Sequence, residues 1–116
     1  MPRLNHLHLH VRSVARARDF YARYFGLRDH VWHDDILFMR DADDGMDLAL
    51  APAPTLDAFP PWFHFGFRLE RPDDVAALHA LLTADGVDAS ELTRLPDFVV
   101  FRCLDPDGNQ IEVYWE

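Results

Sequence analysis

The sequence has one cysteine, few basic residues and no long apolar run. Cys103 cannot form an internal disulfide, and a lone cysteine does not suggest a structural zinc cluster. The 11 Lys and Arg residues stand against 20 Asp and Glu, and the formal charge of -9 repels nucleic acids and anionic lipid surfaces. No stretch approaches the ~18 uninterrupted apolar residues of a membrane span, and the N-terminus lacks a secretory pattern. We therefore expect a cytoplasmic protein without nucleic-acid or membrane partners.

Apolar residues are plentiful enough for a folded domain. The chain has 116 residues, of which 49% are hydrophobic and 13% aromatic, so disorder and fibrous structure are excluded. This length suits one domain and is too short for two domains with separate cores. We expect a single domain over residues 1–116.

The expected elements occur in the same order twice. The first set is a strand over 4–11, a helix between Ser13 and Gly26, and strands near 28–33, 36–40 and 46–50, with a turn at 41–45. The second set is a strand over 63–69, a helix over 73–85, and strands near 91–95, 97–104 and 110–115.

A proline-rich segment separates the two sets. Residues 51–61 hold four of the eight prolines, which do not fit inside a helix or a central strand. The sequence thus predicts an α+β fold of two tandem βαβββ modules. Module one spans 1–51, the linker 52–61 and module two 62–116.

Three polar residues occupy related positions on the predicted strands. His6 and His64 hold the same place in the two repeats, and Glu112 lies on the closing strand. Strand alternation turns all three away from the faces that the helices cover. Two imidazoles and a carboxylate form the ligand set of a facial-triad metal site. Alternating polar residues are also normal on a sheet face that meets water, so a solvated face remains open.

Several segments resemble the vicinal oxygen chelate superfamily. They are LNHLHLHVRSVARARDFYARYFGL, FHFGFRL and the closing FRCLDPDGNQIEVYWE, and together the match covers essentially the whole chain. This superfamily includes glyoxalase I, extradiol dioxygenases, fosfomycin-resistance thiol transferases and bleomycin-resistance proteins. The resemblance implies paired βαβββ modules that hold a divalent metal, with ligand roles for His6, His64 and Glu112. It also implies a small-molecule substrate and a homodimer, in which His6 can meet the other two ligands from a partner chain.

Departures from the subfamilies narrow the resemblance. Glyoxalase I adds a fourth ligand where this chain has Ala49, and Asp47 reaches that place only with a slipped register. The fosfomycin enzymes have a threonine where this chain has His8, and a potassium loop where it has 95–98. Extradiol dioxygenases have a tyrosine at the position of Arg102.

Other residues on the same faces are candidates for substrate contacts. Arg102 and Arg68 can clamp a carboxylate or phosphonate, although both arginines can equally pair with acids at the rim of the sheet. His8 is a candidate acid or base, and His10 and Tyr114 are candidate substrate contacts.

A metal-dependent enzyme is the favoured function. Iron(II) with dioxygenase chemistry comes first, and manganese, nickel or zinc also suit the ligands. One alternative is a metal-free binding protein of the bleomycin-resistance type, because the acidic charge and the aromatic run 59–63 suit a cationic ligand. Another is a glyoxalase-like isomerase or lyase, which depends on whether Asp47 reaches the metal.

Overall fold

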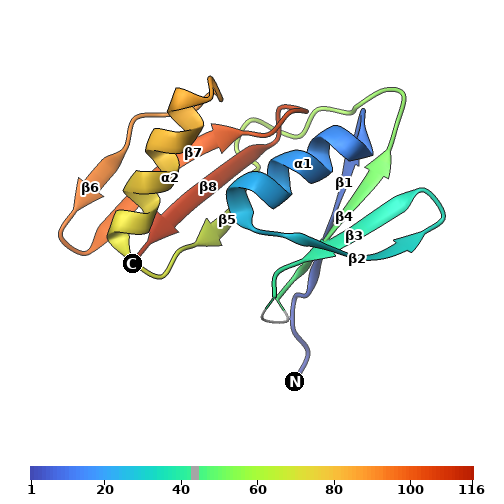
Figure 1. The fold of residues 1–116 in the computed structure, drawn as a ribbon, viewed down its shortest axis with the longest axis horizontal. Helices are drawn as coiled ribbons and strands as arrows, with labels where there is room; N and C mark the ends of the chain where they lie inside the picture. The colour runs from blue at the N-terminus through green and yellow to red at the C-terminus, as the bar shows by residue number, and fades with distance from the viewer. Residues whose placement is uncertain (43–44) are drawn as a thin grey trace. The chain divides into compact units, whose positions relative to one another are not determined.

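The computed structural model describes residues 1–42 and 45–116 and divides the chain into two compact units, 1–58 and 59–116 (Figure 1). The predicted turn at 41–45 includes Asp43 and Asp44, which lie outside the described residues. Each unit holds one helix and a four-stranded mixed sheet, so the predicted α+β fold of two βαβββ modules is confirmed.

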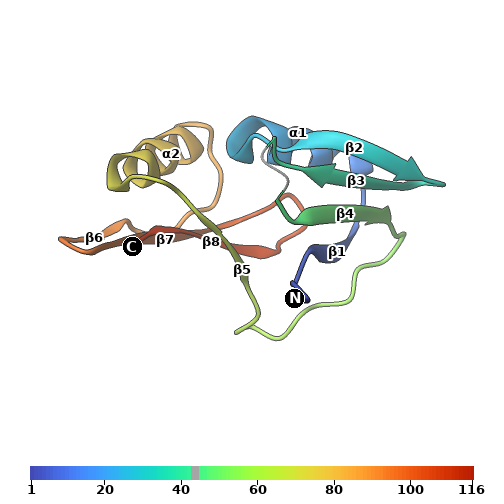
Figure 2. The same cartoon turned by 90° about the horizontal axis from the view of Figure 1, so that it is seen from below.

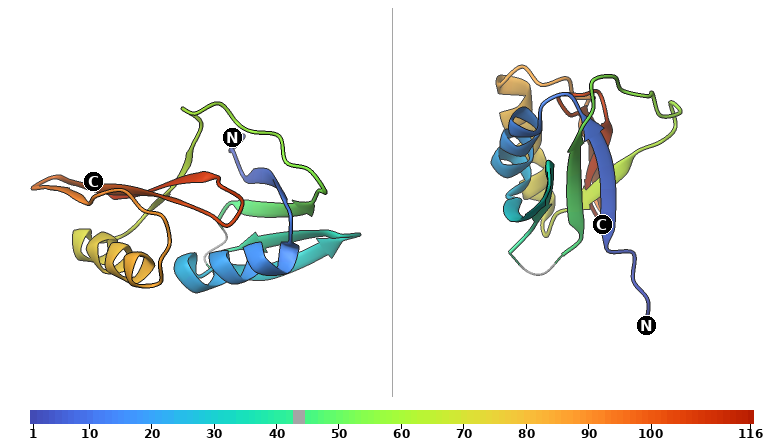
Figure 3. Two further views of the ribbon diagram at one scale, coloured as in Figure 1. Left: turned by 90° about the horizontal axis from the view of Figure 1, so that it is seen from above. Right: turned by 90° about the vertical axis from the view of Figure 1, so that its right-hand side faces the viewer.

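The first unit has its elements in the predicted order. They are β1 (His6–Val11), α1 (Val14–Phe25), β2 (Arg28–His33), β3 (Ile36–Arg40) and β4 (Asp47–Pro52). The strand order is β1-β4-β3-β2, with β1 parallel to β4 and the other pairs antiparallel. Helix α1 lies on one face of this sheet, against β3 and β4 (Figure 3).

Local sequence explains both ends of α1. Ser13 has an extended backbone, and its side chain accepts a hydrogen bond from the Arg16 N–H. Gly26 ends the helix at φ 67, where a residue with a side chain is strained. The Gly26 N–H donates to the Ala22 carbonyl and the Leu27 N–H to the Tyr21 carbonyl, which satisfies two carbonyls of the last turn.

The second unit repeats this arrangement. Its elements are β5 (Phe65–Arg68), α2 (Pro72–Ala84), β6 (Thr93–Leu95), β7 (Phe98–Leu104) and β8 (Gln110–Trp115). The strand order is β5-β8-β7-β6, with β5 parallel to β8. Helix α2 lies on one face of the sheet (Figure 2) and packs against β7 and β8.

Strand alternation separates the two faces of the second sheet. Buried residues on β7 and β8 alternate with half-buried ones. The fully or almost fully buried set is Val99, Phe101, Cys103, Ile111 and Val113. Arg102 and Glu112 lie between these positions, so they are on the face that α2 does not cover.

The expectation that no proline of 51–61 lies in a central strand was wrong. The prolines were expected to keep 51–61 out of a central strand, but β4 continues to Pro52. The Asp47 and Ala53 N–H groups donate to Asn5 and Val11 on the β1 side, so the alternate position, Pro52, faces β3. Pairing with β3 ends at Leu50, and a proline nitrogen there costs no ladder hydrogen bond.

Neither helix in the described ranges is both long and apolar enough to cross a membrane.

Candidate functional site

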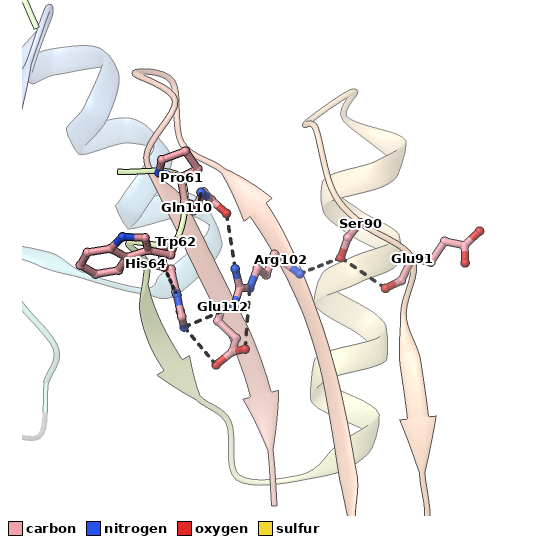
Figure 4. Close-up of polar contacts among 8 residues, drawn as sticks. All are labelled: Pro61, Trp62, His64, Ser90, Glu91, Arg102, Gln110 and Glu112. Atoms are coloured by element: carbon pink, nitrogen blue, oxygen red, sulfur yellow. Dashed lines mark hydrogen bonds and ion pairs between the residues drawn. The ribbon is translucent and has the colours of Figure 1, made fainter. Parts of the chain in front are cut away.

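Three charged or polar side chains converge on the open face of the second sheet: His64, Arg102 and Glu112 (Figure 4). The sheet register explains why they meet. Glu112 on β8 lies directly opposite Gly66 on β5 and Arg102 on β7. His64 precedes β5 by one residue, so its side chain leaves the same face as Gly66.

The three side chains make close polar contacts with one another. Glu112 Oε2 is 3.9 Å from His64 Nε2, and Glu112 Oε1 is 3.8 Å from Arg102 Nε. Arg102 Nη2 is 3.4 Å from His64 Nε2. The side chains are 34%, 41% and 29% exposed for His64, Arg102 and Glu112, so a small molecule can reach them. The guanidinium therefore borders both an imidazole nitrogen and a carboxylate.

A turn before β5 orients the imidazole of His64. The Phe63 N–H donates to the Pro60 carbonyl at 2.9 Å, and His64 Nδ1 lies 3.0 Å from the Trp62 carbonyl oxygen. A carbonyl can only accept, so Nδ1 carries a proton, and in the neutral imidazole Nε2 then presents a lone pair. That lone pair is directed at Arg102 and Glu112 (Figure 4).

Neighbouring groups hold Arg102 at both ends. Its backbone N–H donates to Ser90 Oγ at 2.9 Å, and its Nη1 donates to Gln110 Oε1 at 3.5 Å. Gln110 in turn donates from Nε2 to the Pro61 carbonyl at 2.6 Å. Gln110 thus ties the start of β8 and the guanidinium to the same turn that orients His64.

The first unit carries different side chains at the equivalent register positions. Ala49 on β4 lies opposite His8 on β1 and Phe38 on β3, just as Glu112 lies opposite Gly66 and Arg102. The strand pairing therefore makes Ala49 the register equivalent of Glu112. Phe38 also meets His33 edge to face at 5.3 Å between ring centroids.

The three histidines of β1 are exposed on one face, as their alternation predicts. His6 Nδ1 lies 3.0 Å from Asn5 Oδ1. His8 and His10 meet edge to face, with ring centroids 5.4 Å apart. His6 belongs to the first unit, whereas His64 and Glu112 belong to the second.

Asp47 is engaged by a neighbour on β3. Arg40 binds it with two hydrogen bonds, Nε to Oδ1 at 2.7 Å and Nη2 to Oδ2 at 3.0 Å. The hydrogen bond from Arg40 lowers the pKa of Asp47, and the charges of His30 and His6 act in the same direction. Asp47 pairs with His6 in the register, so no slip moves it to the position of Ala49.

The remaining predicted residues lie near the end of β8. Arg68 donates from Nη2 to the Glu116 carbonyl at 2.8 Å, which directs its guanidinium to the end of the strand. A Cβ added at Gly66 would lie 3.5 Å from Tyr114 Cε1, so the Tyr114 ring leans over this glycine. Cys103 is buried toward α2, as expected, and burial raises its pKa to about 12.

Two contributors were missed from sequence. The Trp62 carbonyl and the Gln110 side chain orient His64 and Arg102, yet neither was assigned a role. Gln110 stands two residues before Glu112 in the expected strand over 110–115, and strand alternation, which puts both on one face, was the available signal. A backbone carbonyl carries no sequence signature at all.

Comparison with known proteins agrees with this architecture. Residues 3–113 match the family model of the Glyoxalase/Bleomycin resistance protein/Dioxygenase superfamily. A possible glyoxalase from Bacillus cereus is 31% identical, with a TM-score of 0.83 and 96% of each chain covered. A fosfomycin resistance protein from Listeria monocytogenes is 16% identical, with a TM-score of 0.85 and coverage of 100% of this chain and 94% of that one.

A lactoylglutathione lyase from Agrobacterium tumefaciens is 21% identical, with a TM-score of 0.73 and coverage of 97% and 92%. These last two likenesses concern the fold alone. No curated protein matches the chain. The family match over residues 3–113 and the Bacillus cereus relative show that the chain belongs to the Glyoxalase/Bleomycin resistance protein/Dioxygenase superfamily.

Proposed function

We propose that the protein is a divalent-metal-dependent enzyme that chelates neighbouring oxygens of a small substrate. The observation that carries this proposal is the pair formed by His64 Nε2 and Glu112 Oε2, 3.9 Å apart on an accessible sheet face. His6 is proposed as the third ligand, on the strength of its equivalent place in the first module.

The donor pair fits a transition-metal ion. Two cis donors of an octahedral ion, each bound at about 2.1 Å, lie about 3.0 Å apart, so the 3.9 Å pair would bind one ion after its two side chains move about 1 Å closer. The hydrogen bond from His64 Nδ1 to the Trp62 carbonyl selects the tautomer with a free lone pair on Nε2. Metal-bound histidines are typically oriented by such a second hydrogen bond.

Among the described residues, 1–42 and 45–116, no group of three or more His, Cys, Asp or Glu side chains is assembled that could hold a metal ion. The proposal therefore rests on the donor pair in the second unit and on the family. Its third ligand is to be tested by substitution.

Each proposed role follows from the contacts of a side chain. A bound iron(II), or manganese, nickel or zinc in its place, would act as a Lewis acid and lower the proton affinity of chelated oxygens. Arg102 would bind an anionic group of the substrate through its planar fork. Because Arg68 is directed at the Glu116 carbonyl, we assign the main anion contact to Arg102. His8 would serve as an acid or base, and His10 and Tyr114 would contact substrate.

Dioxygenase chemistry with iron(II) remains the first candidate reaction. The second candidate reaction is that of a glyoxalase-like isomerase or lyase, and the 31% identity to a possible glyoxalase supports it. A four-ligand site of the glyoxalase I type has less support, because Ala49 occupies the ligand position and Arg40 binds Asp47. Oxygen uptake with catechols, compared with turnover of 2-oxo acids and thiol adducts, separates the two reactions.

Metal content measured by mass spectrometry tests the proposed site. Tag-free protein is loaded anaerobically with iron(II), and about one ion per chain is expected in the wild type. His64→Ala and Glu112→Ala should each lose the ion, and His6→Ala tests the third ligand. Matched controls are His30→Ala and Glu70→Ala, which alter exposed residues outside the proposed ligand set. A wild type that takes up no iron, manganese, nickel or zinc would sink the proposal.

The assembly and location are proposed with the function. Light scattering on the same sample should give the mass of two chains, since a homodimer is the assembly that the superfamily implies for a chain of this length. A cytoplasmic location is suggested by the lone, buried cysteine.

A metal-free binding protein is the second candidate. Trp62 is 73% exposed and Phe59 is 46% exposed, and Phe59 stacks on Phe63 with ring centroids 4.3 Å apart. Exposed aromatic rings on a chain of net charge -9 suit a cationic aromatic ligand. Fluorescence quenching of tryptophan by such a ligand in metal-free protein would favour this alternative.

A further inference from the structure

We propose that Arg102 couples the binding of the divalent ion to the binding of a small anion, so that each ligand strengthens the other. This inference rests on the proposed function, and it specifies the substrate class as a small acid with a second oxygen beside its anionic group. Arg102 is the residue that produces the coupling.

The guanidinium contacts both proposed metal ligands. Its Nη2 is 3.4 Å from His64 Nε2, and its Nε is 3.8 Å from Glu112 Oε1. The same guanidinium therefore donates to the imidazole nitrogen and pairs with the carboxylate (Figure 4). In the protein without ligands, Arg102 supplies the positive charge that these two side chains would otherwise take from a metal ion.

The contacts to Arg102 and to a metal exclude each other. The lone pair on His64 Nε2 can accept a hydrogen bond from Arg102 Nη2 or bind an ion, but it cannot do both. A guanidinium within a few ångströms of a dication also repels it, because the effective dielectric near a protein surface is only about 20. The ion thus binds only after the guanidinium has moved away from His64, which weakens metal binding.

An anion reverses this effect. Once a metal ion has displaced the guanidinium, Arg102 has lost its contacts with His64 and Glu112. A carboxylate or phosphonate can then accept two parallel hydrogen bonds from its N–H groups. The anion also reduces the repulsion between the guanidinium and the ion. By thermodynamic linkage, the factor by which the anion raises metal affinity equals the factor by which the metal raises anion affinity.

The surroundings of Arg102 favour such a limited movement. The Ser90 hydroxyl accepts a hydrogen bond from the Arg102 backbone N–H at 2.9 Å, whereas the guanidinium donates to Gln110 Oε1 over a longer distance of 3.5 Å. The base of the side chain is therefore fixed, and the side chain itself is 41% exposed. The guanidinium has room to leave His64 without leaving the sheet face.

The test is a titration with manganese(II), in which electron paramagnetic resonance measures the free ion. Wild type, Arg102→Gln and Arg94→Gln are compared, each with and without glycolate, which offers a carboxylate beside a hydroxyl. Arg94→Gln is the matched control, because it removes the same charge from β6 of the same sheet, where Arg94 pairs with Asp73. Ethylene glycol serves as the uncharged counterpart of glycolate, and thermal unfolding verifies that each variant is folded.

We expect Arg102→Gln to bind manganese(II) at least about tenfold more tightly than wild type without glycolate, a difference of about 1.4 kcal/mol. Glycolate should tighten manganese binding about fivefold or more in wild type and in Arg94→Gln, and by less than about twofold in Arg102→Gln. Ethylene glycol should leave the manganese affinity of all three proteins unchanged.

Two results would overturn the inference in different ways. If manganese binds wild type and Arg102→Gln with equal affinity, or if glycolate acts equally on both, the coupling is wrong while the metal site stands. If neither protein binds manganese with or without glycolate, the proposed metal site is itself wrong and the coupling fails with it.

Discussion

The Asp105→Ala substitution tests the turn that leads into β8, the strand that carries Glu112. Asp105 is 5% exposed, and its carboxylate accepts three hydrogen bonds. Oδ1 accepts from the backbone N–H groups of Asp107 and Asn109, and Oδ2 accepts from Asn109 Nδ2, each at 2.9 Å. Alanine removes every one of these acceptors.

The magnitude follows from the groups left without a partner. Each orphaned donor costs about 1–3 kcal/mol, and the two backbone donors together cost about 2–4 kcal/mol when water only partly replaces the carboxylate. With a urea m-value of about 2 kcal/mol/M, a loss of about 3 kcal/mol lowers the unfolding midpoint by about 1.5 M.

Urea unfolding followed by tryptophan fluorescence measures this loss. Asp97→Ala is the matched control, because Asp97 is an exposed aspartate in the other hairpin of the same unit, and it should change stability by less than about 0.5 kcal/mol. Asp105→Asn retains one acceptor oxygen, so its stability should lie between those of Asp105→Ala and Asp97→Ala. If Asp105→Ala is no less stable than Asp97→Ala, the three hydrogen bonds do not stabilise the turn as argued.

Three further predictions concern the stability and chemistry of other sites. Because Arg40 lowers the pKa of Asp47 in the folded state, the ionised carboxylate stabilises the fold above its ordinary pKa of about 3.9, and this stabilisation is lost as pH falls from there through the lowered pKa of the folded state. Asp47→Asn should thus be less stable than wild type by about 1 kcal/mol at pH 7, and this difference should shrink as pH falls below about 4 in urea unfolding; a constant difference would contradict the pairing. Cys103, with a pKa raised to about 12, should react with a disulfide reagent only after denaturation, and rapid labelling of native protein would contradict its burial. Gly26→Ala should cost about 1 kcal/mol in thermal unfolding because φ is 67 there, and an unchanged midpoint would argue against the left-handed helix end.

Most of the fold was predictable because its signals are local. Ser13 and Gly26 mark the ends of α1 through a side-chain acceptor and a left-handed backbone, both of which depend on residues next to the helix. The alternation along β7 likewise places Arg102 opposite the buried face. Pro52 was misplaced because its tolerance depends on where a neighbouring strand stops pairing, which is a property of the sheet and not of the segment.

The sequence predicts which sheet face each residue of the candidate site lies on, but it does not predict their contacts. Alternation assigns His64, Arg102 and Glu112 to one side of a sheet, and it also assigns Arg68 there. Only the structure separates the two arginines, because one fork is directed at Glu112 and the other at the Glu116 carbonyl. Such differences depend on side-chain rotamers and on the end of β8, for which sequence spacing carries no signal.

The register shows how one repeated unit can acquire two chemical roles. Where the second module has Glu112 opposite Arg102, the first has Ala49 opposite Phe38. A charged pair that faces solvent and an apolar pair at the same sheet position have equal backbone hydrogen bonds, so the fold tolerates either. The second module therefore carries a charged pair on its open face, where the first module has an apolar pair in which Ala49 is buried. The chemistry of each sheet face is set by a few outward positions, because the buried residues beneath α1 and α2 already stabilise both modules.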